Sequence, residues 1–283
     1  MIGGGQLARM MQEEASALGI RLRALVEAAD GSTGQVTPDA PVGAADDEVA
    51  VRAVVAGDGT QGLGGEPAAV LTFEHEHQES GLLERLQSEG VSVQPTPQAL
   101  TLARDKLAMR RMMSRAGLPQ PAWDEIGGPQ QETAEQMTDA VEAFAGEHGW
   151  PVVLKTPRGG YDGHGVLLVR SAESLREGEA AEWIASVARA RAGQGDGRGA
   201  GGGGSLGGSA VTSLLVEQAI PFTRELAVLL ARSPSGQIAV WPVAQTVRRA
   251  ACVPRSWRRR PVSTRPRLRR PSSSDARWRN VPG

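Results

Sequence analysis

Short apolar runs alternate with helical patterns through the first hundred residues of the chain. The runs at 20–26, 68–73 and 91–93 are rich in Val, Leu and Ala and are typical of strands. Between them, residues 49–55 and 82–86 have the spacing of short helices. Strands that alternate with helices predict an α/β fold whose N-terminal domain is doubly wound and Rossmann-like.

Three consecutive glycines, Gly3 to Gly5, open this first domain. They lead into a helical pattern with four large apolar residues on one face, Leu7, Met10, Met11 and Leu18. Glycines at a strand-to-helix turn serve either phosphate binding at the helix N-terminus or close packing. The sequence leaves both uses open, because the triple glycine lacks the full dinucleotide fingerprint.

A second domain follows the first after a turn rich in proline. A helical pattern runs from residue 99 through residue 113, and Gly117 ends it. We therefore place the first domain at 1–97 and the second at 98–247.

The second domain contains two further helical patterns, at 133–148 and 175–191. Residues 193–208 hold ten glycines and predict a disordered insert. The apolar run at 225–232 predicts one strand, and residues 237–241 return after a turn at 233–236.

The most informative stretch of the second domain is a glycine-dense hairpin between two apolar runs, 150–154 and 166–169. Lys155 stands at the root of the connecting loop, and four glycines follow it. Backbone N–H groups of such a loop can approach an oxyanion closely. The stretch is either a flap that closes over a polyphosphate or an ordinary glycine-rich hairpin with a surface lysine.

The composition excludes several classes of protein. The single cysteine, Cys252, excludes a disulfide framework and a cysteine-based zinc site. The chain shows neither a signal-type leader nor an apolar run of 18 residues, so we expect a soluble, cytoplasmic protein with no membrane partner.

The overall net charge of −1 hides a strong asymmetry. Residues 244–283 hold twelve arginines and one acid, Asp275, which leaves a net of about −12 in residues 1–243. The tail at 248–283 is either a basic arm for nucleic acid or a segment foreign to the rest of the chain. Its lack of helical spacing and its Ser/Pro runs favour plain disorder over a nucleic-acid partner.

A polar loop follows the apolar run at 68–73. Glu74, His75, Glu76 and His77 come directly after the run, where open α/β sheets bind ligands. Three interpretations remain open here: a contact to a substrate, a solvated loop, or a metal site with ligands from one loop only.

These segments, in this order, resemble the ATP-grasp superfamily and, within it, the 5-(carboxyamino)imidazole ribonucleotide synthases. The resemblance covers roughly residues 1–247, apart from the glycine-rich insert. It rests on the following motifs: Gly3 to Leu7, Thr72 to His75, Ala103 to Lys106, Lys155 with Arg158 to Gly165, and Val216 to Gln218 with Glu225.

The resemblance implies an ATP-grasp fold with a Rossmann-like pre-ATP-grasp domain and specific roles for these residues. Lys106 and Lys155 correspond to the cations that hold the ATP phosphates. The flap over the phosphates corresponds to Gly160, Tyr161, Asp162, Gly163, His164, Gly165 and Val166. The hinge that reads adenine corresponds to Glu217, Gln218, Ala219 and Ile220, and Glu225 corresponds to the ribose-binding carboxylate. Gly5, Gln6 and Glu74 correspond to the region that binds the ribonucleotide.

The implied activity is that of an ATP-dependent carbon–nitrogen ligase in purine (IMP) biosynthesis. Bicarbonate is phosphorylated to carboxyphosphate, and the amino group of 5-aminoimidazole ribonucleotide captures the carboxyl group. The implied cofactors are ATP and Mg²⁺, and the family tends to form homodimers. Another ATP-grasp ligase with a different acceptor remains an alternative. No catalytic residue is assigned.

The family pattern stops after Val247. Arg, Pro, Ser and Trp dominate from there on, and no period of 2 or 3.6 survives. This composition is expected where a GC-rich reading frame is entered out of register, so we expect a frameshifted, truncated product with an incomplete C-terminal half of the ATP-grasp domain. The expected Mg²⁺ ligands fall beyond this point, and no metal ligand is assigned. We therefore expect little or no synthase activity from this chain.

Overall fold

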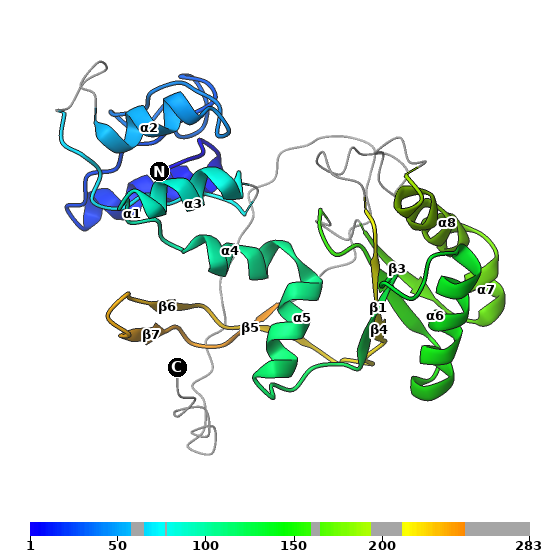
Figure 1. Cartoon of the computed structure of the whole chain (residues 1–283). Coiled ribbons are helices and arrows are strands. Elements are labelled where there is room, and N and C mark those ends of the chain that lie inside the picture. Colours follow the sequence, from blue (N-terminus) through cyan, green and yellow to red (C-terminus); the bar gives the residue numbers. More distant parts are fainter. Residues whose placement is uncertain (58–64, 77, 160–164, 194–210, 247–283) are drawn as a thin grey trace, which may run out of the picture. The chain divides into compact units, whose positions relative to one another are not determined.

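A computed structural model of the chain describes residues 1–57, 65–76, 78–159, 165–193 and 211–246 (Figure 1). The chain divides into two units, Met1–Ala219 and a second unit that begins at Ile220. Within the first unit, one set of apolar residues forms a core between residues 1 and 100, and another forms a separate core between residues 126 and 216.

Five extended segments form the centre of the N-terminal domain. Parallel bridges join Val42 to Val26, Leu25 to Ile2, Ile2 to Phe73, and Leu71 to Val93. Numbered by their order in the sequence, the segments lie side by side as 3-2-1-4-5. This is the strand order of a Rossmann-type domain. The predicted doubly wound topology is confirmed.

The predicted strands at 20–26, 68–73 and 91–93 are shorter in the structure than the sequence indicated. They contribute isolated bridges rather than ladders of paired residues. Ile20 and Val70, which lie inside the predicted strands, are 57% and 47% exposed. In these three segments the bridging residues are buried or half-buried: Arg23, Leu25, Val26, Leu71, Phe73 and Val93.

Four helices surround these segments: α1 (Gln6–Ala17), α2 (Glu48–Ala56), α3 (Ser80–Ser88) and α4 (Pro97–Arg104). All four were expected. The predicted apolar face of α1 is not its buried face, because Leu7 and Leu18 are 56% and 71% exposed. Ala8 and Ala15 are the buried residues of α1. Small side chains let the helix pack closely on the sheet, and the large ones border an apolar groove between α1 and residues 66–72.

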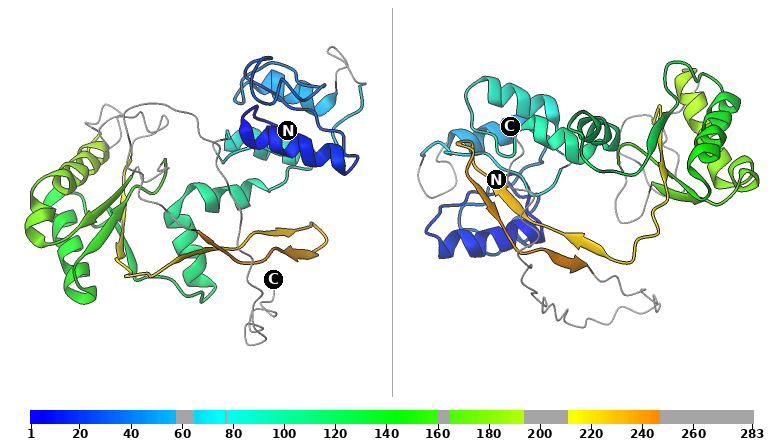
Figure 2. Two further views of the ribbon diagram at one scale, coloured as in Figure 1. Left: turned by 180° about the vertical axis from the view of Figure 1, so that it is seen from behind. Right: turned by 90° about the horizontal axis from the view of Figure 1, so that it is seen from below.

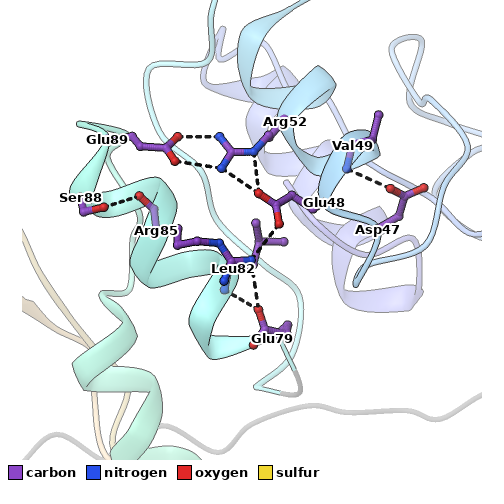
Figure 3. A network of polar contacts seen from close by, with 9 residues as sticks. All are labelled: Asp47, Glu48, Val49, Arg52, Glu79, Leu82, Arg85, Ser88 and Glu89. Carbon is purple, nitrogen blue, oxygen red and sulfur yellow. Dashed lines mark hydrogen bonds and ion pairs between the residues drawn. The ribbon is translucent and has the colours of Figure 1, made fainter.

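A surface network of ion pairs connects α2 with α3 (Figure 3). Arg52 on α2 pairs with Glu48 one turn earlier at 2.8 Å and with Glu89 at 2.5 Å. Arg85 on α3 reaches Glu48 at 2.8 Å. Each of these carboxylates is partly exposed, so the network adds modestly to the packing of the two helices.

The expected continuous helix from residue 99 to residue 113 is wrong in one respect: it breaks at Asp105. The backbone of Asp105 is extended, and its carboxylate caps a new helix, α5 (Lys106–Arg115), by accepting the amide of Ala108 at 3.0 Å. An aspartate at this position competes with the helical ladder for backbone N–H groups, which is why it starts a helix rather than continuing one. Lys106 consequently becomes the first residue of α5.

A four-stranded antiparallel sheet follows, in the order β1 (Trp123–Ile126), β4 (Leu214–Gln218), β2 (Val152–Lys155) and β3 (Val166–Val169). The predicted helix at 133–148 is confirmed as α6 (Ala134–His148), which begins with a capping box at Thr133. Together with α7 (Ala172–Arg176) and α8 (Glu179–Arg191), it covers one face of the sheet (Figures 1 and 2).

The predicted single helix at 175–191 is therefore two helices. Gly178 separates them with a φ of 80°, a left-handed conformation that a helix does not continue through. The strand β1 was not predicted, because only Ile126 of its four residues is buried and its sequence contains no apolar run.

The described part of the second unit, residues 220–246, contains two antiparallel strand pairs. The predicted strand at 225–232 is wrong as a single element, since it changes partner between Ala227 and Leu230. β5 (Glu225–Ala227) pairs with β8 (Ala244–Thr246), which was not predicted, and β6 (Leu230–Arg232) pairs with β7 (Ile238–Val240). The turn at 233–236 is confirmed.

Several predictions fall outside the described residues. They concern the flap residues Gly160, Tyr161, Asp162, Gly163 and His164, the insert at 193–208 apart from its first residue, and the tail at 248–283. None of the helices formed by the described residues has the length and hydropathy needed to span a membrane.

Candidate functional site

The sheet of the second domain presents a polar face opposite α6 and α8. Along β2, Val152 and Leu154 point into the apolar core, so Val153 and Lys155 point to the other face. The register pairs Val153 with Glu217 on β4, which places Lys155 and Glu217 diagonally on the same face. The Lys155 amine donates to Oε2 of Glu217.

The first turn of α5 brings the second lysine to the same place. The amide of Lys106 donates to the carbonyl of Pro157 at 2.9 Å, and its Nζ donates to the carbonyl of Thr156 at 3.1 Å. Asp105 accepts Arg158 at 2.9 Å, which adds a third link between the start of α5 and the end of β2. The structure therefore brings Lys106 and Lys155 together at the root of the glycine hairpin.

Glu217 is the most buried charged group of this cluster, with 4% of its side chain exposed. Its Oε1 accepts Nε of Arg110 at 2.7 Å and lies 2.6 Å from Nη2, while Oε2 accepts Lys155. Burial makes an unpaired carboxylate costly, so two cationic partners stabilise it in place. The side chain of Glu217 is paired with Arg110 and Lys155, and its backbone lies in β4 between β1 and β2.

The cluster carries an excess of positive charge. Four cations stand against two carboxylates, a net of about +2: Lys106, Lys155, Arg110 and Arg158 against Asp105 and Glu217. Burial lowers the pKa of Lys106, the nearby charge of Lys155 lowers it further, and the carboxylates of Asp105 and Glu217 oppose this shift. Two amines held close together beside an excess of positive charge are suited to sharing an anion such as a polyphosphate.

Lys106 and Lys155 are the only two lysines of the entire chain, against 29 arginines. A chain that otherwise uses arginine throughout has both of its ammonium groups at one site. Lysine offers a compact, mobile point charge, whereas arginine offers a rigid planar fork. This count was available from the sequence but was not used there.

At the root of the glycine hairpin, the chain on either side forms antiparallel backbone contacts. The amide of Thr156 donates to the carbonyl of Gly165 at 2.9 Å, and Lys155 pairs with Val166. Gly165 has a φ of 70°, which a residue with a side chain rarely adopts. The hydroxyl of Thr156 is fully buried beside these contacts.

The predicted hinge lies where β4 ends. Glu217 and Gln218 belong to β4, and the amide of Gln218 donates to the carbonyl of Ala122 at 2.9 Å. Ala219 ends the first unit, and Ile220 begins the second. Glu225 lies in the second unit, where it pairs with Thr246 at the start of β5.

The predicted ribonucleotide-binding residues are partly brought together in the N-terminal domain. The amide of Gly5 donates to Oε2 of Glu74 at 2.7 Å. A Cβ on Gly3 would lie 2.8 Å from Cβ of Glu74, so a side chain there has no room. The glycines thus serve close packing against Glu74. The side chain of Gln6 instead accepts Ser32 at 3.2 Å.

The metal interpretation of the loop after residue 73 gains no support. Among the residues that the structure describes, no three His, Cys, Asp or Glu side chains are placed to hold a metal ion. His75 instead contacts Gln78 at 3.4 Å, and His77 lies outside the described residues.

Comparison with known families gives two consecutive matches. Residues 1–104 match the ribonucleotide synthetase preATP-grasp domain, and residues 111–269 match the ATP-grasp domain. The second match alone covers more than half of the chain.

The chain belongs to the ATP-grasp family.

Relatives within this family align with most of the chain. The chain is 42% identical over 254 residues to the N5-carboxyaminoimidazole ribonucleotide synthase of Mycobacterium tuberculosis, covering 89% of the chain and 49% of that protein. It is 34% identical to the corresponding protein of Corynebacterium ammoniagenes, covering 88% of the chain and 50% of that protein. The chain therefore spans about half the length of the curated relatives it matches.

Solved structures agree with these matches. The ADP complex of an N5-carboxyaminoimidazole ribonucleotide synthetase has a TM-score of 0.63 and 26% identity, over 88% of the chain and 54% of that structure. The enzyme of Thermus thermophilus has a TM-score of 0.61 and 26% identity, over 88% of the chain and 55% of that structure. The predicted ATP-grasp fold with a pre-ATP-grasp domain is confirmed.

Sequence reasoning missed Arg110 as a member of this site. It lies four residues after Lys106, so a helix that begins at Lys106 carries both side chains on one face. That spacing is visible in the sequence. Its meaning depended on the break at Asp105 and on the position of β4, neither of which the sequence pattern showed.

Proposed function

We propose that this chain binds ATP at the face formed by β2, β4 and the start of α5. The single observation that carries the proposal is that Lys106 and Lys155 lie close together at the root of a glycine hairpin. Two ammonium groups with a net positive surrounding favour the triphosphate, and the hairpin glycines let backbone N–H groups approach it.

The reaction we propose is the ATP-dependent carboxylation of 5-aminoimidazole ribonucleotide with bicarbonate, which gives N5-carboxyaminoimidazole ribonucleotide in purine biosynthesis. The names of the relatives support this choice. In this reaction, ATP phosphorylates bicarbonate, and the amine of the ribonucleotide displaces phosphate from the carboxyphosphate. The two lysines neutralise phosphate charge and orient the reacting phosphoryl group.

Other residues of the site have supporting roles in the proposal. The backbone at 217–220 reads adenine, and Glu225 accepts the ribose hydroxyls. Gly5, Gln6 and Glu74 bind the ribonucleotide in this proposal, because they lie in the segment that matches the ribonucleotide synthetase preATP-grasp domain. Mg²⁺ supports phosphoryl transfer when it is bound, and no step here is assigned to it.

Thermal stabilisation by MgATP tests the nucleotide site directly. The wild-type chain should gain stability with increasing MgATP by mass action. The Lys106→Met/Lys155→Met variant should lose most of that gain, because each charge-assisted hydrogen bond contributes about 1.5–3 kcal/mol. Arg176→Met, which removes an exposed pair with Glu142, is the matched control. Equal stabilisation of the wild-type chain and the double variant would contradict the proposal.

The identity of the acceptor needs a separate measurement. Because we expect little synthase activity from this chain, the test concerns the ADP release that it retains. That release should be stimulated by aminoimidazole ribonucleotide together with bicarbonate, and not by other amines. Stimulation by a different amine would favour another ATP-grasp ligase. A nucleic-acid role for the tail at 248–283 would instead show as salt-dependent retention on DNA that is lost when the tail is removed.

A further inference from the structure

We propose that Arg110 is a positioning residue for Lys155, acting through Glu217. It holds Glu217 from α5 and so determines how firmly Glu217 retains the Lys155 amine. The inference rests on the proposed nucleotide site, because the amine has to leave Glu217 to reach a phosphate.

The geometry gives each partner its own carboxylate oxygen. Arg110 donates to Oε1 through Nε at 2.7 Å, and Nη2 lies 2.6 Å from the same oxygen. Lys155 donates to Oε2. The exposed fractions of the side chains are 11% for Arg110, 4% for Glu217 and 24% for Lys155. The arginine is thus a buried, fixed partner, and the lysine is the more accessible, mobile one.

The shared carboxylate makes the two cations dependent on each other. When Lys155 turns to a phosphate, Glu217 keeps Arg110 and remains a paired charge. Without Arg110, the same movement would leave a buried carboxylate unpaired, which is strongly unfavourable. Arg110 therefore lowers the cost of transferring Lys155 from Glu217 to a ligand.

The neighbouring arginine provides a matched control. Arg111 follows Arg110 on α5 but turns away from Glu217 and pairs with Glu125 on β1, with 48% of its side chain exposed. Arg110 also contacts Gln120 at 3.5 Å, whose amide donates back to the carbonyl of Arg110 at 3.3 Å. These contacts give Arg110 a fixed place that Arg111 does not share.

Amine labelling followed by mass spectrometry measures the retention of Lys155 without any nucleotide. Only the unprotonated amine reacts, and the amino group of Met1, whose charged neighbours are Arg23 and Asp39, is an internal reference outside this cluster. In Arg110→Met, Glu217 has one cation left, and labelling of Lys155 should fall about fivefold relative to Met1. Arg111→Met should leave the ratio unchanged.

A second pair of variants covers the case in which Arg110→Met does not fold. Glu217→Gln should raise the labelling of Lys155, and adding Arg110→Met to it should cause no further change, because the shared charge is gone. Removing both partners of a buried pair is tolerated better than removing one. An Arg110-dependent change that persists in the Glu217→Gln background would overturn the inference, as would a Lys155 ratio in Arg110→Met equal to that in Arg111→Met.

Binding of MgADP to the full chain, measured by calorimetry, connects the inference to the ligand. Arg110→Met should weaken MgADP about tenfold, whereas Arg111→Met should bind it like the wild-type chain. Wild-type affinity in Arg110→Met would overturn the role of Arg110 in ligand binding. A wild-type chain that binds no MgADP contradicts the proposed function instead, and the labelling ratios then decide the inference on Arg110 by themselves.

Discussion

The backbone amide of Lys106 donates a hydrogen bond to the carbonyl of Pro157 at 2.9 Å. This contact fastens the first turn of α5 to the chain that leaves β2, across fifty residues of sequence. It places the amine of Lys106 beside the peptide that follows Lys155. Two lysines from different elements are thereby brought to the root of one hairpin.

The lowered pKa of Lys106 predicts a pH dependence of nucleotide binding. Burial and the charge of Lys155 bring this pKa below the ordinary value of 10.5, so the amine loses its charge earlier than an exposed lysine would as pH rises. MgADP affinity should decline in that alkaline range. Lys106→Arg should retain affinity there because a guanidinium stays charged. A calorimetric series against pH that gives identical declines for both proteins would refute this assignment.

Asp105 combines two roles that one pair of substitutions separates. It caps α5 through Ala108 and pairs with Arg158. Asp105→Ala loses the cap and should lower the free energy of unfolding by about 1 kcal/mol. Asp105→Asn keeps a capping side chain and should lie close to the wild-type value. Urea unfolding of the three proteins measures the difference, and equal loss in both variants would show that the cap is not the source.

Replacement of glycine by alanine should have opposite effects on stability at two positions, one in the glycine turn at the start of the chain and one inside α6. Gly3 has a φ of 109°, and a Cβ there would lie 2.8 Å from Cβ of Glu74. Gly3→Ala should therefore cost about 2 kcal/mol of stability. Gly146 is an exposed residue inside α6 with open space around it, so Gly146→Ala should stabilise by about 0.5–1 kcal/mol. Melting temperatures that move in the same direction would contradict the packing argument.

The network between α2 and α3 predicts a contribution to stability that depends on pH and on salt. Hydrogen bonds from Arg52 lower the pKa of Glu48 and of Glu89 below the ordinary 4.5. A depressed carboxyl pKa stabilises the fold above pH 4.5, and the contribution is lost as pH falls through the folded-state value. The melting temperatures of the wild-type chain and Arg52→Gln should therefore differ at pH 7, and the difference should shrink in acid and in high salt.

Arg115→Gln is the control for that comparison, because Arg115 is an exposed arginine at the end of α5. It should show neither the acid dependence nor the salt dependence. A gap between the wild-type chain and Arg52→Gln that stays constant across pH would mean that packing, rather than the ion pairs, produces it.

Regular local patterns predicted the fold well where one residue period continued over a whole element. The spacing of Met137, Val141 and Phe144 predicted α6 and its buried face, and all three are buried. The glycines and apolar flanks of the hairpin predicted β2 and β3. Prediction was weaker where a single residue interrupted an element, as at Asp105 and Gly178. The helical spacing of apolar residues continues across such a residue, so it does not reveal the break.

Prediction was weakest where pairing partners are far apart in sequence. β1 pairs with β4 although ninety residues separate them, and its residues carry no apolar signal. The large side chains of α1 resembled a buried face, yet the alanines are the residues that pack. Which face is buried depends on how closely two elements approach, and that distance is a property of the folded molecule.

The sequence by itself indicated most of the helices, the doubly wound class of the first domain, the glycine hairpin and the two lysines. Local residue types and their periods encode these features, because they act over a few neighbouring positions. Only the tertiary structure decided that Glu217 is shared between Arg110 and Lys155, and that Lys106 lies beside Thr156. Those contacts arise from strand register and from the packing of α5, where residues from distant parts of the chain meet around one buried charge.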